Sequence, residues 1–140
     1  MADLARKLGI LAGDLVCLLD APTEAESAIR DSAPHGVQFS SSLSGSLFQT
    51  ILFWPAELPG LADRFTQLQG CIVPDGAIWA VMPKKKYAPQ RGVAFTWEQM
   101  QAAGLSTDLV DNKVASVTEQ DYATRFVIRK ERRMNYDKST

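Results

Sequence analysis

An unbroken apolar run near the start of the chain constrains the fold more than any other feature of the sequence. Residues 14–20 read Asp-Leu-Val-Cys-Leu-Leu-Asp, with five apolar side chains in a row. A strand with one face in water alternates apolar and polar residues, so a continuous run is typical of a parallel strand covered on both faces. Residues 46–54 and 77–82 are also strand-length and largely apolar. The sequence therefore predicts a mostly parallel sheet between two layers of helices.

Segments with helical patterns or end signals separate these strands. Apolar residues recur on one face between Pro59 and Cys71, and Thr96 is a good N-cap for the last helix. Glycine takes the left-handed conformation cheaply, so Gly9 and Gly104 are expected to end the first and last helices. The expected helices cover residues 3–8, 23–31, 59–71 and 96–103.

A short second strand is expected at Val37–Ser40, but its connection is unusual. The link at residues 41–45 is too short to hold a helix, whereas a parallel crossover normally takes a dozen or more residues. Two alternatives remain open. Either this link is an extended return, or Val37–Ser40 is not a regular parallel strand.

The end of the predicted sheet is a β-hairpin. Leu109–Val117 and Tyr122–Ile128 are joined by only four residues, so they must be antiparallel neighbours. The 140 residues suit one domain, which we place at residues 1–128, followed by a charged, flexible tail at residues 129–140. The predicted fold class is α/β, a truncated doubly wound, Rossmann-like sheet that is mostly parallel and ends in an antiparallel hairpin.

This order of elements resembles the class I variant of the S-adenosylmethionine (SAM)-dependent methyltransferase fold. Residues 8–16 resemble the entry into the first strand of such enzymes, and residues 73–79 resemble the turn before their central strand. Trp79–Lys85, Leu109–Val114 and Arg125–Val127 resemble a bacterial family of small methyltransferase-like proteins known only as a domain of unknown function. The resemblance covers nearly the whole chain and implies a fold without an established activity.

The resemblance also implies a cofactor site, which the first loop does not match. The methyltransferase pattern has glycines after the first strand, where this chain has Ala21, Pro22 and Thr23, and an acidic residue closing the second strand, where it has Ser40. Only Asp20 matches. We therefore expect no cofactor and a degenerate, non-catalytic binding protein. The alternatives are a SAM-dependent methyltransferase with an atypical first loop, and a subunit that forms an oligomer.

The expected ligand edge of the sheet carries the candidate binding residues. Ligands of open α/β sheets bind beyond the carboxyl ends of the parallel strands, where Asp20 and Pro22 follow the first strand. Lys84, Lys85 and Lys86 follow a later strand, and their ammonium groups suit an anionic small molecule or an acidic protein partner. The competing interpretation is a solvated loop that keeps an exposed tip soluble.

A cluster of polar residues lies in the predicted hairpin. Asp111, Lys113 and Arg125 are expected on paired strands, either as an ion-pair staple or as a partner-binding patch. No metal site is expected, because Cys17 and Cys71 lie in apolar segments without ligand spacing, and the single histidine stands alone.

The near-neutral total charge hides two unlike halves. Residues 1–80 hold four Lys or Arg and nine Asp or Glu, a net charge of −5, whereas residues 81–140 hold eleven and seven, a net of +4. This argues against bulk nucleic-acid binding but leaves a local positive edge. The first residues do not resemble a signal peptide and no run is long enough to cross a membrane, so a cytoplasmic protein is expected.

Overall fold

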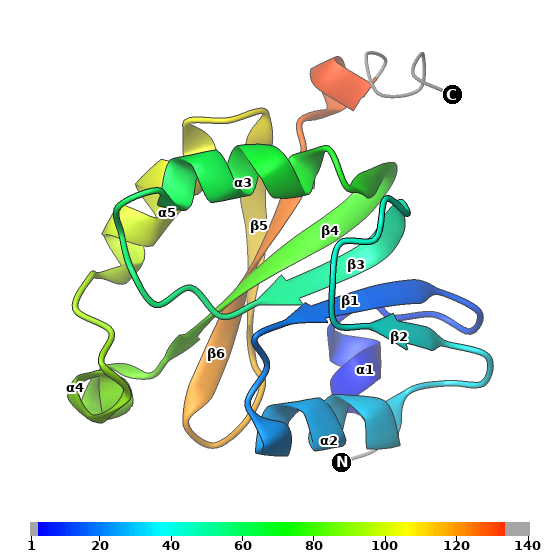
Figure 1. Cartoon of the computed structure of the whole chain (residues 1–140), viewed down its shortest axis with the longest axis horizontal. Helices are drawn as coiled ribbons and strands as arrows, with labels where there is room; N and C mark the ends of the chain where they lie inside the picture. Colours follow the sequence, from blue (N-terminus) through cyan, green and yellow to red (C-terminus); the bar gives the residue numbers. More distant parts are fainter. Residues whose placement is uncertain (1–2, 134–140) are drawn as a thin grey trace.

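A six-stranded mixed sheet organises the chain (Figure 1). The computed structural model describes residues 3–133. The strand order is β2-β1-β3-β4-β6-β5; β1 to β4 run parallel, and β6 is antiparallel to both β4 and β5. The strands are β1 (Leu15–Leu19), β2 (Gln38–Ser40), β3 (Phe48–Phe53), β4 (Ile72–Pro83), β5 (Leu109–Ser116) and β6 (Asp121–Ile128).

Helices cover both faces of this sheet (Figure 1). One core packs residues of α1 and α2 against β1, β3, β4 and β6, and a second core packs α3 and α5 against the opposite face. The helices are α1 (Leu4–Lys7), α2 (Thr23–Ser32), α3 (Leu61–Gln69), α4 (Ala88–Arg91) and α5 (Trp97–Leu105). The α/β, Rossmann-like fold class with a C-terminal antiparallel hairpin is therefore confirmed.

The second strand is regular, which resolves the two alternatives for its connection. Gln38 pairs with Leu15 and Ser40 with Cys17 in parallel register. The chain then returns over β1 without a helix to begin β3 (Figure 1). Leu43 of this link is partly buried against the core on the face that α3 and α5 cover, and the Cys17 thiol donates a hydrogen bond to the Ser42 carbonyl at 3.6 Å.

Two local expectations are wrong. Gly104 does not end the last helix, because α5 continues to Leu105. Gly104 is instead buried against the Phe126 ring, which occupies the space that a Cβ atom would need. The basic segment after β4 is not an irregular loop either: Lys85–Tyr87 form a 3₁₀ turn, and α4 follows at once.

The chain also continues past the hairpin into a short 3₁₀ turn at Lys130–Arg132. The Arg132 guanidinium forms a 2.6 Å ion pair with Asp108, just before β5. Residues 134–140 of the expected flexible tail lie outside the described residues. Within residues 3–133, no helix has the length and apolar character needed to span a bilayer.

A change of direction in the sheet positions the site. β1 and β3 are parallel neighbours, but the chain leaves β1 toward α2 and β2, whereas it leaves β3 toward α3 and β4 on the other side. The two helices cover opposite faces, so a crevice opens between the carboxyl ends of β1 and β3. Open α/β sheets bind ligands at such a switch point.

Candidate functional site

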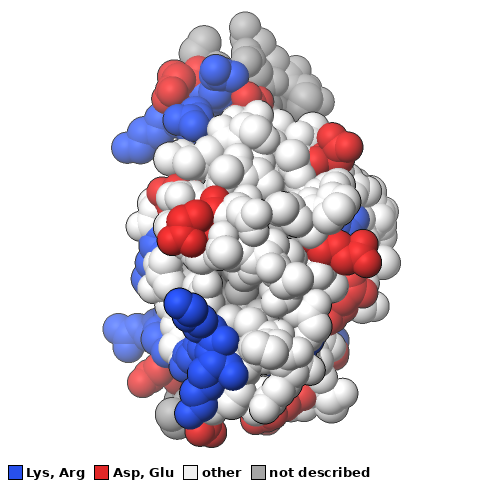
Figure 2. All heavy atoms as spheres, turned by 90° about the vertical axis from the view of Figure 1, so that its left-hand side faces the viewer, with Lys and Arg blue, Asp and Glu red and all other residues white. Residues whose placement is uncertain are grey.

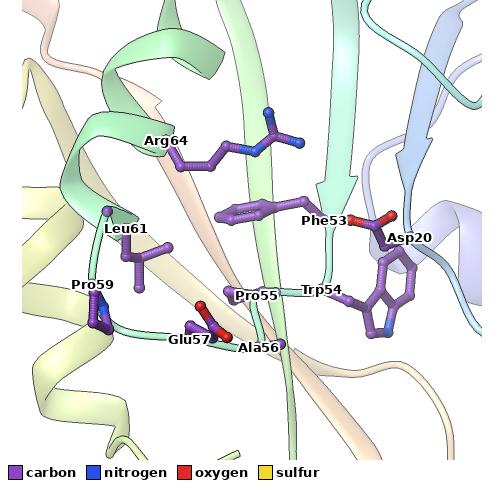
Figure 3. Close-up of a pocket in the computed structure, with 10 residues that line it drawn as sticks. Asp20, Phe53, Trp54, Pro55, Ala56, Glu57, Pro59, Leu61 and Arg64 are labelled. Carbon is purple, nitrogen blue, oxygen red and sulfur yellow. The ribbon is translucent and has the colours of Figure 1, made fainter.

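A cavity of about 290 Å³ lies at this switch point, and we call it the Asp20 cavity (Figure 3). Its walls come from the end of β1, the segment that follows β3 and the start of α3. The residues that line it are Asp20, Phe53, Trp54, Pro55, Ala56, Glu57, Pro59, Gly60, Leu61 and Arg64.

Asp20 has an unusual backbone conformation. Its φ is 63°, and every other described residue with a positive φ is a glycine. The left-handed conformation costs an ordinary residue about 1–2 kcal/mol, although aspartate tolerates it better than most residues. Within residues 3–133 the exposed Asp20 carboxylate makes no hydrogen bond or ion pair. The chain therefore turns sharply after β1 and leaves a carboxylate free at the cavity.

The other walls combine aromatic rings with one cation. Trp54 lies beside Asp20, and the Arg64 side chain extends from α3 over Phe53 (Figure 3). Trp54 Nε1 is buried without a hydrogen-bond partner among residues 3–133. Arg64 Nη1 donates to Gln67 Oε1 at 2.7 Å, which leaves further guanidinium N–H groups for a ligand. The cavity thus offers two carboxylates, Asp20 and Glu57, together with one cation and apolar walls.

Sequence reasoning missed Glu57 and Arg64. Both belong to the segment that follows a buried strand, from the end of β3 into α3, which is where open α/β sheets place their ligands. The position of the segment was therefore available from the sequence, but the side of the sheet to which α3 returns was not.

The expected ligand residues do not form one site. Asp20 lines the cavity at the switch point, whereas Pro22 precedes α2 and is not among its lining residues. Lys85 lines a different cavity, at the end of β4. Lys84 Nζ donates to Ser116 Oγ at 3.2 Å, and Lys86 Nζ lies 5.2 Å from the centre of the Tyr87 ring.

The lysines nevertheless lie on the expected edge of the sheet. Figure 2 views the side on which the parallel strands end, and Lys and Arg side chains gather there near α4, beside a wide uncharged surface. Lys85 and Lys86 are exposed, and Lys84 is half-buried. The structure therefore places positive charge along the ligand edge, away from Asp20.

The polar strand residues are close together but bind different partners. Asp111 accepts a 3.0 Å hydrogen bond from Gln101 Nε2, and Lys113 Nζ donates to the Lys7 carbonyl at 3.2 Å. Arg125 donates to the Asn112 side-chain oxygen at 3.3 Å. Burial lowers the pKa of Arg125 from its ordinary value, and nearby Arg133 lowers it further. Among residues 3–133 these groups link strands to neighbouring elements without an ion pair between Asp111 and Arg125.

Metal-ligating side chains do not cluster in the described part of the chain. No group of three His, Cys, Asp or Glu residues is placed there to hold an ion. Cys17 and Cys71 are free thiols.

The fold and the crevice together define the class: an α/β, Rossmann-like methyltransferase fold with a six-stranded mixed sheet. A protein described as a type 11 methyltransferase from Sulfolobus solfataricus matches with a TM-score of 0.63 and 11% identity, over 91% of this chain and 90% of that one. A SAM-dependent methyltransferase from Aquifex aeolicus matches with a TM-score of 0.60 and 8% identity, over 89% and 87%.

A third neighbour was solved with a product of methyl transfer. The N-methyltransferase NodS from Bradyrhizobium japonicum, in complex with S-adenosyl-L-homocysteine (SAH), matches with a TM-score of 0.57 and 10% identity, over 91% of this chain and 83% of that one. No protein-family model matches the sequence, and no curated protein is similar to it in sequence. At these identities the similarity establishes the fold.

These neighbours overturn the expectation of a chain without a cofactor. Solved structures that share this fold include SAM-dependent methyltransferases, and one of them holds SAH. The expectation rested on the missing glycines after β1. The finding that overturns it is the SAH-bound neighbour, and the chain also has a left-handed turn at the end of β1, where Asp20 has a φ of 63°.

Proposed function

We propose that this chain is a SAM-dependent methyltransferase that binds SAM in the Asp20 cavity. The observation that carries the proposal is the free carboxylate of Asp20, held in a left-handed turn at the switch point of a methyltransferase fold. Bound SAM supplies an electrophilic methyl group on a sulfonium. Residues held in sparsely populated backbone conformations cluster at ligand sites, which favours this end of β1 as the functional one.

The lining residues fit the chemical groups of SAM. The Asp20 carboxylate can accept hydrogen bonds from ribose hydroxyls or an ammonium, and the remaining Arg64 N–H groups can bind a carboxylate. Phe53 and Leu61 provide apolar surface for the uncharged parts of the ligand. The Trp54 side chain adds further apolar surface at the wall.

Two features depart from the methyltransferase pattern. Pro22 stands where a glycine is usual, and it offers no backbone N–H to a ligand. Ser40 ends β2 where an acidic residue is usual. In methyltransferases with an acidic residue at that position, its carboxylate binds the ribose hydroxyls. The proposal assigns this role to Asp20.

Glu57 is the group best placed to handle a proton. It lines both the Asp20 cavity and an adjacent hollow of about 580 Å³, which is also lined by residues before and within α5. A methyl acceptor must lose a proton from the atom that becomes methylated if that atom is a hydroxyl or an ammonium. The Glu57 carboxylate, at the junction of the two spaces, can hold that proton.

Calorimetric titration tests this proposal directly. We expect SAM and SAH each to bind at one site, and Asp20→Asn to weaken binding about tenfold, a loss of about 1.4 kcal/mol. Asparagine tolerates the left-handed conformation, so the backbone turn is retained. The matched control is Asp63→Asn, which removes an exposed carboxylate from α3 outside the cavity. No binding at millimolar SAM, or equal weakening by both variants, would overturn the proposal.

The finer expectations from the sequence belong to the same proposal. We place the chain, through residues 79–85 and 109–114, with the bacterial family of small methyltransferase-like proteins, and in the cytoplasm. Methyl transfer to any acceptor separates this enzyme from the degenerate binding protein of the first hypothesis. Solution mass measurement tests the third hypothesis, an oligomer.

A further inference from the structure

A second cavity of about 550 Å³, which we call the aromatic cavity, opens at the carboxyl end of β4. Its walls come from the end of β4, the start of β6, α4 and the segment that leads into α5. Most of them are apolar or aromatic. The lining residues are Met82, Pro83, Lys85, Ala88, Pro89, Val93, Ala94, Phe95, Thr96, Trp97, Glu98 and Tyr122.

Hydrogen bonds and an ion pair hold these walls in place. Trp97 Nε1 donates to the buried Thr124 hydroxyl at 2.8 Å, which fixes the indole ring against β6. Arg91 at the end of α4 binds buried Asp121 at 2.7 Å, so α4 is fastened to the start of β6. The Thr96 side chain and Gln99 form a capping box at the start of α5. The cavity is therefore preformed, which lowers the entropic cost of binding a rigid ligand.

Few polar groups line this space. Burial and the nearby Glu98 carboxylate raise the pKa of Tyr122, so its phenol remains protonated at neutral pH. Lys85 supplies the only cation among the lining residues, and exposed Lys86 adds positive charge nearby. Glu98 is the single lining carboxylate, and it lies in the first turn of α5, where the helix dipole stabilises it. The two lining charges therefore balance, and positive charge is confined to the Lys85 side of the cavity, where exposed Lys86 follows in the chain.

The hollow lined by Glu57 adjoins both the Asp20 cavity and the aromatic cavity. The hollow shares Ala56, Glu57 and Pro59 with the Asp20 cavity, and it shares Ala94 and Phe95 with the aromatic cavity. Phe95 therefore lies at the boundary between the aromatic cavity and the hollow, and Glu57 lies at the boundary between the hollow and the Asp20 cavity.

From this arrangement we infer that the aromatic cavity binds the methyl acceptor, a flat aromatic molecule with an acidic substituent that meets Lys85. The inference rests on the proposed function, because it assigns the acceptor of that reaction. Phe95, Trp97 and Tyr122 supply ring faces and edges to an aromatic core. The ammonium of Lys85 selects for the acidic substituent.

Calorimetry with two probes of the same shape tests the inference. The probes are 2-naphthoate and its uncharged counterpart 2-naphthamide, titrated into the full chain with and without saturating SAH. We expect naphthoate to bind at least about tenfold more tightly than naphthamide, and Lys85→Gln to abolish this preference. The control Lys86→Gln removes a neighbouring exposed lysine that does not line the cavity, and should retain most of it. Ala94→Phe should weaken both probes by occupying part of the aromatic cavity, which Ala94 lines.

The outcomes separate the two proposals. Equal binding of the two probes, or an unchanged preference in Lys85→Gln, would overturn the acidic aromatic acceptor even when SAM binds. Preferential naphthoate binding in a chain that does not bind SAM would overturn the proposed methyltransferase, and with it the assignment as acceptor. SAM binding together with a preference that depends on Lys85 supports both.

Discussion

Buried Asp121 and half-buried Arg91 form an ion pair that ties the hairpin to α4. Arg91 Nη1 lies 2.7 Å from Asp121 Oδ1 and Nη2 lies 3.4 Å from Oδ2, while the Asp121 side chain is only 4% exposed. The backbone of Asp121 also closes the turn, because its carbonyl accepts from Val117 and its N–H donates to the Thr118 hydroxyl. The pair therefore fixes one wall of the aromatic cavity.

Removing the arginine should destabilise the chain strongly. Arg91→Ala leaves the Asp121 carboxylate buried without its partner, so we expect the free energy of unfolding to fall by about 3 kcal/mol, measured by urea denaturation. The double variant Arg91→Ala with Asp121→Asn should recover part of this loss, because the buried charge is gone. A loss below about 0.5 kcal/mol in the single variant would show that the pair contributes little.

The contact between Gly104 and Phe126 predicts an unusual result for a helix substitution. Alanine forms helix better than glycine by about 1 kcal/mol, yet Gly104→Ala places a methyl group where the Phe126 ring lies. We expect a net loss of about 1–3 kcal/mol in thermal or urea unfolding. Phe126→Leu in the same chain should reduce this penalty by vacating the space. Stabilisation by Gly104→Ala alone would contradict the contact.

The turn at Asp20 can be tested independently of ligand binding. Asp20→Gly and Asp20→Ala both remove the carboxylate, but only glycine adopts a φ of 63° without steric cost. We expect the glycine variant to be more stable than the alanine variant by about 1 kcal/mol in urea denaturation. Equal stabilities would mean that this residue does not hold the left-handed conformation in solution.

Cys17 makes stability depend on pH in the alkaline range. Burial raises the pKa of its thiol to about 11 from 9.0, with a further contribution from Cys71. The unfolded chain loses this proton near pH 9 while the folded chain retains it, so the stabilisation is complete below pH 9 and declines as the pH rises toward 11. Urea denaturation between pH 8 and pH 11 should show this decline in the natural chain and in Cys71→Ala. A decline of the same size in Cys17→Ala would assign it to other groups.

Local patterns determined which segments form strands and helices. The continuous apolar runs of β1, β3 and β4 indicated strands buried on both faces, and the four-residue turn between β5 and β6 allowed only an antiparallel hairpin. The apolar spacing of α3 predicted its buried face, which Leu61, Phe65 and Leu68 form. These features depend on residues close together in the sequence, so the sequence alone was sufficient to predict them.

Other outcomes depended on residues far apart in the sequence. Gly104 resembled a helix end until Phe126 was placed against it. In the sequence, Asp20 was the only residue of the first loop that matched the methyltransferase pattern. The structure shows that its backbone is left-handed. The lysines after β4 seemed to share a site with Asp20, but their turn places Lys85 at a separate cavity.

The sequence by itself determined a doubly wound α/β sheet and the edge at which the carboxyl ends of its parallel strands meet. Only the tertiary structure decided which side chains meet at that edge, because the parallel pairing of β1 with β3 and the return of α3 bring Asp20 and Arg64 to one cavity. The spacing of apolar residues along a segment predicts which of its faces are buried. It does not predict which distant segment covers those faces. The groups that line the Asp20 cavity depend on that packing of distant segments.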